Sequence, residues 1–270
     1  MLVLEHVNKT FNAGTIIEVK ALRDISCTIE EGSFVVLLGT NGSGKSTILN
    51  AIAGAFYPDS GNIILNKHNI TRLPEHKRAA FLGRVFQNPF SGTAPDMSIA
   101  ENLSLAAKRG LFRGLGNALP NHLYSHFRER VKPLNMGLED RLDSPIGKLS
   151  GGQRQALTLL MASWRKPDLL LLDEHTAALD PKTAAKVIRL TEEIVARDRL
   201  TTMMVTHSMQ QAVNMGNRIL MLHNGRIVHD FRGDEKKRLK AADLLELFDR
   251  IRKTEQVDAS AAEMLAANYI

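Results

Sequence analysis

The sequence predicts an α/β fold in which helices cover a parallel sheet. Three short apolar runs carry this prediction: Phe34–Leu38, Leu169–Leu172 and Met203–Val205. Continuous apolar runs of this length are typical of strands that are buried on both faces, as the strands of parallel sheets are. Segments with helical periodicity, such as Ala184–Arg197, lie among the runs. This alternation of strand and helix is the pattern of an α/β core.

The first part of the chain predicts strands of another kind. Leu2 and Leu4 alternate with polar neighbours, and Ile25–Ile29 alternates again. Such alternation predicts strands with one buried face. Gly61–Leu65 predicts a further short strand, and Glu30–Ser33 predicts a turn before the first apolar run.

The middle and the end of the chain are predicted to be helical. A loop rich in Pro, Gly, Ser and Thr precedes a mostly helical stretch that runs from Ser98 to about Leu138. Beyond Asp230 the chain becomes charged and helical. Since roughly forty residues make a poor independent core, we expect this tail to be a docking helix rather than a second domain. Its apolar stripe consists of Leu244, Leu245, Leu247 and Phe248.

Composition indicates a cytosolic protein. No apolar run is long enough to span a membrane, and the N-terminus lacks the features of a signal peptide. Cys27 is the only cysteine, which excludes an internal disulfide and favours a reducing compartment. The net charge of +6 is compatible with binding to a nucleotide, a nucleic acid or an anionic membrane surface. The basic segment Lys108–Lys132 is either a solvated helical face or a face near lipid headgroups or nucleic acid.

The most informative feature is a glycine-rich loop between the first apolar run and a helical segment. It reads GTNGSGKST and comprises Gly39, Thr40, Asn41, Gly42, Ser43, Gly44, Lys45, Ser46 and Thr47. This pattern is a P-loop, in which glycines let the backbone curl so that its N–H groups point at a phosphate. The following helix adds the positive end of its dipole. We expect Lys45 to reach the β- and γ-phosphates of a nucleoside triphosphate and Ser46 to ligate Mg²⁺.

Two carboxylates follow the second apolar run. Asp173 and Glu174 lie where that strand ends, and ligands of open α/β sheets bind at this edge. Acids also commonly end strands without any such role, but the P-loop upstream favours the functional interpretation. We expect Asp173 to hold Mg²⁺ and Glu174 to orient or deprotonate an attacking water.

A second segment suited to anions opens another helix. It reads LSGGQ and comprises Leu149, Ser150, Gly151, Gly152 and Gln153. Ser150 is a good N-cap residue, and the two glycines leave the first amides of the helix accessible. Two phosphate-binding helix starts in one chain predict a nucleotide that is clamped between two chains.

Together these motifs resemble those of the ATP-binding-cassette (ABC) ATPases, over about residues 1–230. The order is that of the family: the P-loop, a Q-loop at Gln87, LSGGQ, the Asp173–Glu174 pair, a D-loop ending at Asp180 and a switch histidine, His207. The resemblance implies a P-loop NTPase core with an antiparallel β subdomain and an α-helical subdomain inserted at about 88–165. Residues 231–270 would form a C-terminal helical tail.

The resemblance also implies roles for single residues. ATP would bind in a head-to-tail homodimer, where Ser150 and Gly152 contact the γ-phosphate held by the other chain. His207 would bond that phosphate and position the water with Glu174, although a helix-capping role is the alternative. Gln87 would ligate Mg²⁺ or the water, where otherwise it is an ordinary loop residue. Phe11 fits the position of an aromatic that stacks on adenine, or else it belongs to the core of a strand.

One residue departs from the family pattern. His175 follows Glu174, where the family usually has proline. Histidine restores a backbone donor and removes a rigid turn. It would also add a titratable group beside the site.

The resemblance implies an ATPase subunit that energises a separate membrane permease. Import of a small, amino-acid-like solute is favoured, with a solute-binding protein as a further partner and a location on the inner face of the cell membrane. The ATPase subunit of a multi-subunit exporter remains an alternative. A soluble ABC ATPase that acts on ribosomes or DNA is another, but the chain has one cassette and neither heptads nor cysteine clusters. No nucleic-acid partner is expected.

Overall fold

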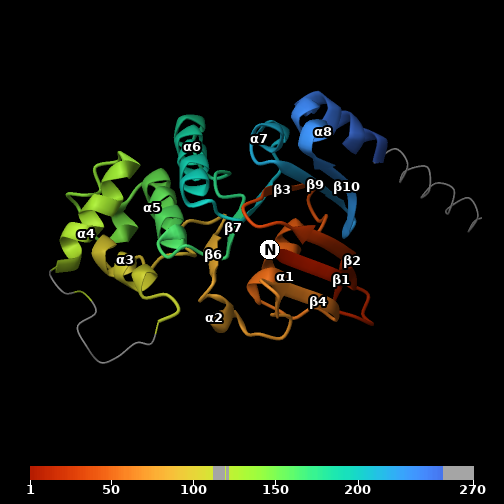
Figure 1. Cartoon of the computed structure of the whole chain (residues 1–270), viewed down its shortest axis with the longest axis horizontal. Coiled ribbons are helices and arrows are strands. Elements are labelled where there is room, and N and C mark those ends of the chain that lie inside the picture. The colour runs from red at the N-terminus through yellow and green to blue at the C-terminus, as the bar shows by residue number, and fades with distance from the viewer. Residues whose placement is uncertain (112–118, 120–121, 252–270) are drawn as a thin grey trace, which may run out of the picture.

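A six-stranded sheet forms the centre of the structure, a computed structural model that describes residues 1–111, 119 and 122–251 (Figure 1). The strand order is β10-β9-β3-β8-β7-β6. The strands are β3 (Phe34–Gly39), β6 (Leu82–Val85), β7 (Leu169–Asp173), β8 (Thr202–Thr206), β9 (Arg218–His223) and β10 (Arg226–Arg232). All neighbours from β9 to β6 are parallel, and β10 is antiparallel to β9. The predicted parallel core is confirmed, with one antiparallel strand at its edge.

A second, antiparallel sheet has the order β2-β1-β4-β5. Its strands are β1 (Leu2–Phe11), β2 (Val19–Ile29), β4 (Ser60–Leu65) and β5 (His68–Asn69). Helix α1 (Lys45–Ala53) packs between the two sheets, because its buried Ile48 and Leu49 share one apolar cluster with Leu4 of β1 and Leu37 of β3. The expected antiparallel β part of the fold is therefore present.

The strand β3 explains why an unbroken apolar run is needed at the centre. Leu37 faces the cluster around α1, whereas its neighbours Val36 and Leu38 face a second cluster on the other side of the sheet. That second cluster includes residues of α5 (Gly151–Ser163), α6 (Pro181–Asp198) and α7 (Met209–Asn214). Successive side chains of a strand point to opposite faces, so a sheet covered on both sides needs apolar residues at every position.

The helical segment between β6 and β7 has its own apolar core and lies at the left of Figure 1. Its elements are α3 (Ile99–Ala107), α4 (His122–Val131), two 3₁₀ turns (Lys132–Leu134 and Ile146–Lys148) and the beginning of α5, while the short α2 (Glu75–Arg78) precedes β6. A capping box between Ser98 and Glu101 fixes the start of α3. None of the helices in the described part of the chain has the length and apolar character that crossing a membrane requires.

Cations of the basic segment Lys108–Lys132 hold this helical segment together. Arg109 donates to two backbone carbonyl oxygens near the end of α5. Arg130 donates to the carbonyl oxygen of Trp164 and lies over its ring, 4.5 Å from the centroid. Arg113 lies outside the described residues. Because Arg109 and Arg130 are used inside the fold, they are poor candidates for contacts with lipid headgroups or nucleic acid.

The C-terminal segment packs on the cassette itself. Strand β10 continues past Asp230, and α8 (Gly233–Arg238) follows it. Residues 241–251 are helical. Their Leu244 and Phe248 are buried in the second apolar cluster, together with side chains of β3 and β9. The predicted apolar stripe is wrong in one member: Leu245 is 52% exposed, because it lies on a different side of the helix from Leu244 and Phe248.

Leu244 and Leu245 form a matched pair for measuring what this docking contributes. We expect Leu244→Ala to lower the free energy of unfolding by about 2–5 kcal/mol, because it removes a fully buried side chain and leaves a cavity. Leu245→Ala should change it by less than about 0.5 kcal/mol. Urea denaturation of the two variants tests this, and equal losses would mean that the helix does not dock through Leu244.

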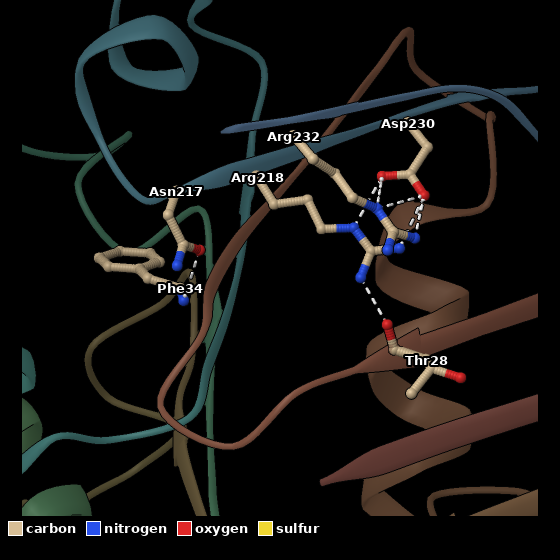
Figure 2. A network of polar contacts seen from close by, with 6 residues as sticks. All are labelled: Thr28, Phe34, Asn217, Arg218, Asp230 and Arg232. Atoms are coloured by element: carbon tan, nitrogen blue, oxygen red, sulfur yellow. Dashed lines mark hydrogen bonds and ion pairs between the residues drawn. The ribbon is translucent and has the colours of Figure 1, made fainter. Parts of the chain in front are cut away.

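A polar network joins the two sheets (Figure 2). Arg218 on β9 forms a bidentate ion pair with Asp230 on β10, at 2.7 Å for both contacts, and also donates to the carbonyl oxygen of Thr28 on β2. Arg232 contacts the same carboxylate. Burial alone raises the pKa of Asp230, but the hydrogen bonds from Arg232 and Arg218 outweigh it and lower the pKa to about 2. The carboxylate therefore stays ionised and holds the Arg218 guanidinium, which makes the contact to β2 of the other sheet.

Candidate active site

The P-loop connects the end of β3 to the start of α1. Gly42 and Gly44 adopt φ values of 79° and 101°, and a Cβ on Gly44 would lie 2.6 Å from the carbonyl oxygen of Ala21. Only glycine tolerates this combination of conformation and close approach. Helix α1 has no side-chain cap and no acid in its first turn, so the positive end of its dipole is not compensated by its own residues. A helix start of this kind is suited to a phosphate.

Lys45 reaches back over the loop that precedes it. Its ammonium donates to the carbonyl oxygens of Gly39 and Thr40, at 2.9 Å each. Burial lowers the pKa of Lys45, while the nearby carboxylates of Glu174 and Asp173 raise it, and the net shift is downward. These two hydrogen bonds hold the Lys45 ammonium directly beside the P-loop, where we expect the phosphates to bind.

Asp173 lies at the carboxyl end of β7, opposite the first turn of α1. Its Oδ1 accepts a hydrogen bond from the Ser46 hydroxyl at 3.2 Å. Burial raises the pKa of Asp173 even though Ser46, Arg84 and Lys45 lower it. The structure thus places two of the three residues that the sequence predicts for Mg²⁺, Ser46 and Asp173, in direct contact. The hydroxyl of Ser46, the carboxylate of Asp173 and the amide oxygen of Gln87, which lines the same cleft as Ser46, are donors of the oxygen type that Mg²⁺ prefers, so these residues fit the ion.

The three predicted catalytic side chains converge on one oxygen. Gln87 donates from Nε2 to Glu174 Oε2 at 3.1 Å, and His207 Nδ1 lies 3.4 Å from the same oxygen. Gln87 comes from the loop after β6, Glu174 from the end of β7 and His207 from the end of β8. Because these strands are parallel, their carboxyl ends meet at one edge of the sheet.

One cleft of about 730 Å³ is lined by the P-loop from Asn41 to Thr47 and by Gln87, Glu174 and His207. Gly39, Thr40 and Asp173 are not among its lining residues. Phe11 lies in its wall and packs edge-to-face on Phe56, with ring centroids 5.2 Å apart. Val19 and Ala21 of β2 also line the cleft, although neither is among the site residues predicted from the sequence. No motif marks these two residues; only the pairing of β1 with β2, which sets Phe11 opposite Val19, brings them to the site.

The LSGGQ segment lies elsewhere in the same chain. Among the described residues that line the cleft, none belongs to Leu149–Gln153. Ser150 caps α5 as expected: its hydroxyl accepts from the Gln153 N–H at 3.3 Å, and the Gln153 side chain accepts from the Ser150 N–H. Asp180 caps α6 in the same way, with Thr183 as donor. The structure therefore does not bring LSGGQ and the P-loop of one chain together.

Two further features differ from the sequence-based expectation. His175 is not a titratable group facing the site: it is 3% exposed, its Nε2 lies 3.0 Å from Thr191 Oγ1, and burial lowers its pKa to about 4. Sequence reasoning also missed Gln211, whose side chain accepts from Thr206 and donates to Thr176. This residue links the chain segments that follow β7 and β8, and no local pattern marks it.

Comparisons with known proteins agree with this geometry. The family model described as "ABC transporter" matches residues 22–177. The chain is 43% identical over 254 residues to a tyrosine transport ATP-binding protein of Clostridioides difficile, covering 92% of this chain and 99% of that protein. It is 30% identical to a methionine import ATP-binding protein of Enterococcus faecalis, over 84% of this chain and 62% of that protein.

A solved structure of a dimeric ATP-binding cassette in a post-hydrolysis state, bound to ADP and Pi, superposes with a TM-score of 0.74 at 29% identity. That match covers 86% of this chain and 98% of the other. The P-loop, the acidic strand end and the family match lead to one conclusion: the chain belongs to the ABC transporter family and is an ATP-binding-cassette ATPase.

Proposed function

We propose that the chain is the ATP-hydrolysing subunit of an importer for a small, amino-acid-like solute, and that it energises a separate membrane permease. The observation that carries the catalytic part is the convergence of Gln87 and His207 on Glu174, beside an uncapped helix start and a buried lysine. These groups supply phosphate binding and water activation in one cleft.

In this proposal each residue has a defined task. The P-loop amides and Lys45 bind the β- and γ-phosphates of ATP. Ser46, Asp173 and Gln87 hold Mg²⁺, which supplies positive charge to the phosphate oxygens. Glu174 orients and deprotonates the attacking water, and His207 holds the γ-phosphate next to it. Phe11 stacks on the base of the nucleotide.

The active unit is a head-to-tail homodimer with ATP between the two chains. Support comes from the position of LSGGQ, which lies outside the cleft of its own chain although its helix start is suited to an anion. Two of the similar solved structures are described as dimeric. Ser150 and Gly152 then contact the γ-phosphate bound by the other chain. ATP that bridges two chains favours the closed state, which is the differential affinity that a ligand-driven switch requires.

The direction of transport and the solute class rest on the relatives. One is named for tyrosine transport, and others for import of methionine or of spermidine and putrescine. An import system of this type implies a permease, a solute-binding protein and a position of this subunit at the cytoplasmic face of the membrane. Gln87 connects the cleft to the helical segment that begins at Ser98, and we place the contact with the permease on that side.

Affinity purification tests the proposal. A tagged Glu174→Gln chain, expressed in its native host and solubilised gently with ATP, should retain a multispan permease. A Lys45→Ala chain is the matched control, since it should not form the ATP-bridged dimer. The solute-binding protein of the same system should bind an amino acid in a calorimetric titration. Recovery of ribosomal proteins or DNA-associated factors without a membrane partner would contradict the transport assignment.

A further inference from the structure

Glu174 has a backbone conformation that must be held in place. Its φ is 42°, in the left-handed region that residues other than glycine seldom adopt. Such a conformation persists only where the surroundings determine it, and it is common at functional sites. Two backbone hydrogen bonds contribute: Glu174 N–H donates to Val205 O at 3.1 Å, and Ala177 N–H donates to Glu174 O at 2.9 Å.

The next residue provides a side-chain anchor on α6. His175 is buried, and its Nε2 lies 3.0 Å from the hydroxyl oxygen of Thr191, which is fully buried. That hydroxyl already donates its one proton to the carbonyl oxygen of Val187, at 2.8 Å. The Thr191 oxygen must therefore accept from His175, so that the imidazole carries its proton on Nε2. The tautomer and the orientation of the ring are fixed by α6.

The contact between His175 and Thr191 takes over the role of a rigid turn after Glu174. A proline after Glu174 would fix the chain through its ring, whereas histidine leaves the backbone free to rotate and ties it down through the side chain. Helix α6, on which Thr191 lies, is capped by Asp180 and begins at Pro181. The contact between His175 and Thr191 therefore ties the start of the loop that leads into α6 to the body of that helix.

We propose that His175 and Thr191 form a positioning pair that holds Glu174 in its productive left-handed conformation. The inference rests on the proposed role of Glu174 as the residue that activates water. Among the described residues that line the cleft, neither His175 nor Thr191 is found, so the pair acts on the catalytic step through Glu174 and leaves ATP binding unaffected.

Substitutions at Thr191 test the pair. Thr191→Val keeps the shape of the side chain but removes the acceptor, and we expect kcat to fall about tenfold while KM for ATP stays unchanged. Thr191→Ser retains the hydroxyl and should restore kcat. Thr191→Ala serves if the valine variant does not fold, because the smaller side chain leaves room for a water that pairs with Nε2 without fixing the ring.

Thr158→Val is the matched control. Thr158 is a buried threonine on α5 whose hydroxyl makes the same hydrogen bond to the carbonyl oxygen four residues back, and in the described part of the chain that hydroxyl has no hydrogen bond to Gln87, Glu174 or His207. Loss of the Thr158 hydroxyl should lower the melting temperature without lowering kcat. A His175→Ala/Thr191→Val double variant should be no slower than the slower single variant, since both remove one interaction.

Measurements on Glu174→Gln distinguish a wrong role for Glu174 from a wrong role for the positioning pair. If Glu174→Gln turns over ATP normally, the role of Glu174 itself is wrong. If Glu174→Gln is inactive but Thr191→Val and Thr191→Ala keep the wild-type kcat, only the positioning pair is wrong. A loss of kcat in Thr158→Val equal to that in Thr191→Val would also overturn the proposal, because the effect would then follow from any weakened helix.

Discussion

The substitution Glu174→Gln is expected to lower ATP turnover by about 10²–10⁴-fold and to leave ATP binding intact. Glutamine has the size of glutamate and can still contact Gln87 and His207, but it cannot accept a proton from water. In the proposed site the nucleotide is bound by other groups, the P-loop and Lys45. Steady-state turnover and equilibrium binding of a fluorescent ATP analogue measure the two effects separately.

Glu192→Gln is a suitable control, because it makes the same change of charge at an exposed position on α6. Its turnover should equal that of the unchanged chain. The Glu174→Gln chain should also accumulate as an ATP-bound dimer, since the step that releases the two chains is blocked. Normal turnover by this variant would show that another group activates the water.

The second large effect is expected for Lys45→Ala, which should weaken ATP binding by about 10–100-fold, the equivalent of about 1.5–3 kcal/mol. Lys45 is the only lysine or arginine among the described residues that line the cleft, so no second side chain of this kind can take its place beside the β-phosphate. Calorimetric titration with ATP measures the loss directly. The rise of the melting temperature that ATP causes in the unchanged chain should shrink accordingly.

Lys186→Ala provides the comparison, because it removes a lysine from an exposed position on α6. It should bind ATP as the unchanged chain does. Tight binding of ATP by the Lys45→Ala chain would mean that the backbone amides and the helix dipole hold the phosphates without the lysine.

Sequence alone predicted the parts of the site that depend on local geometry. The P-loop needs glycine at positions such as Gly44 and a lysine at the helix start, and these requirements appear as a continuous pattern. Asp173 and Glu174 were predictable for a related reason, since ligands of open α/β sheets bind at the carboxyl ends of the strands. The role of His207 was implied only by the resemblance to the family. The parallel core was also predictable, because a strand that is covered on both faces, as β3 is, must be apolar at every position.

The remaining features depend on which segments pack together. Val19 reaches the cleft through the pairing of β1 with β2, which the sequence does not specify. His175 is buried because α6 covers it, and without that helix it reads as an exposed neighbour of Glu174. Leu245 was grouped with Leu244 and Phe248 because the surface of the cassette that receives the helix was unknown. In each case the environment of the side chain comes from residues that are distant in the sequence.

The central claim is that each ATP site is shared between two chains, and mixed dimers test it most directly. Lys45→Ala disables the P-loop. Gly151→Asp disables LSGGQ by placing a carboxylate at the exposed start of α5; an added Cβ there meets Leu179 at an ordinary 3.4 Å, and acids favour the first turn of a helix. Gly152 is unsuitable, because a Cβ would lie 2.0 Å from Thr183.

Each variant alone should be nearly inactive. In an equal mixture, half of the randomly formed pairs contain one chain of each kind, and each such pair has one intact P-loop facing one intact LSGGQ. The mixture should therefore regain about a quarter of the unmixed activity, if the two sites of a dimer act independently. With independent sites, a mixture that remains as inactive as the separate variants would show that each chain builds its ATP site by itself, and would contradict the two-chain site proposed here.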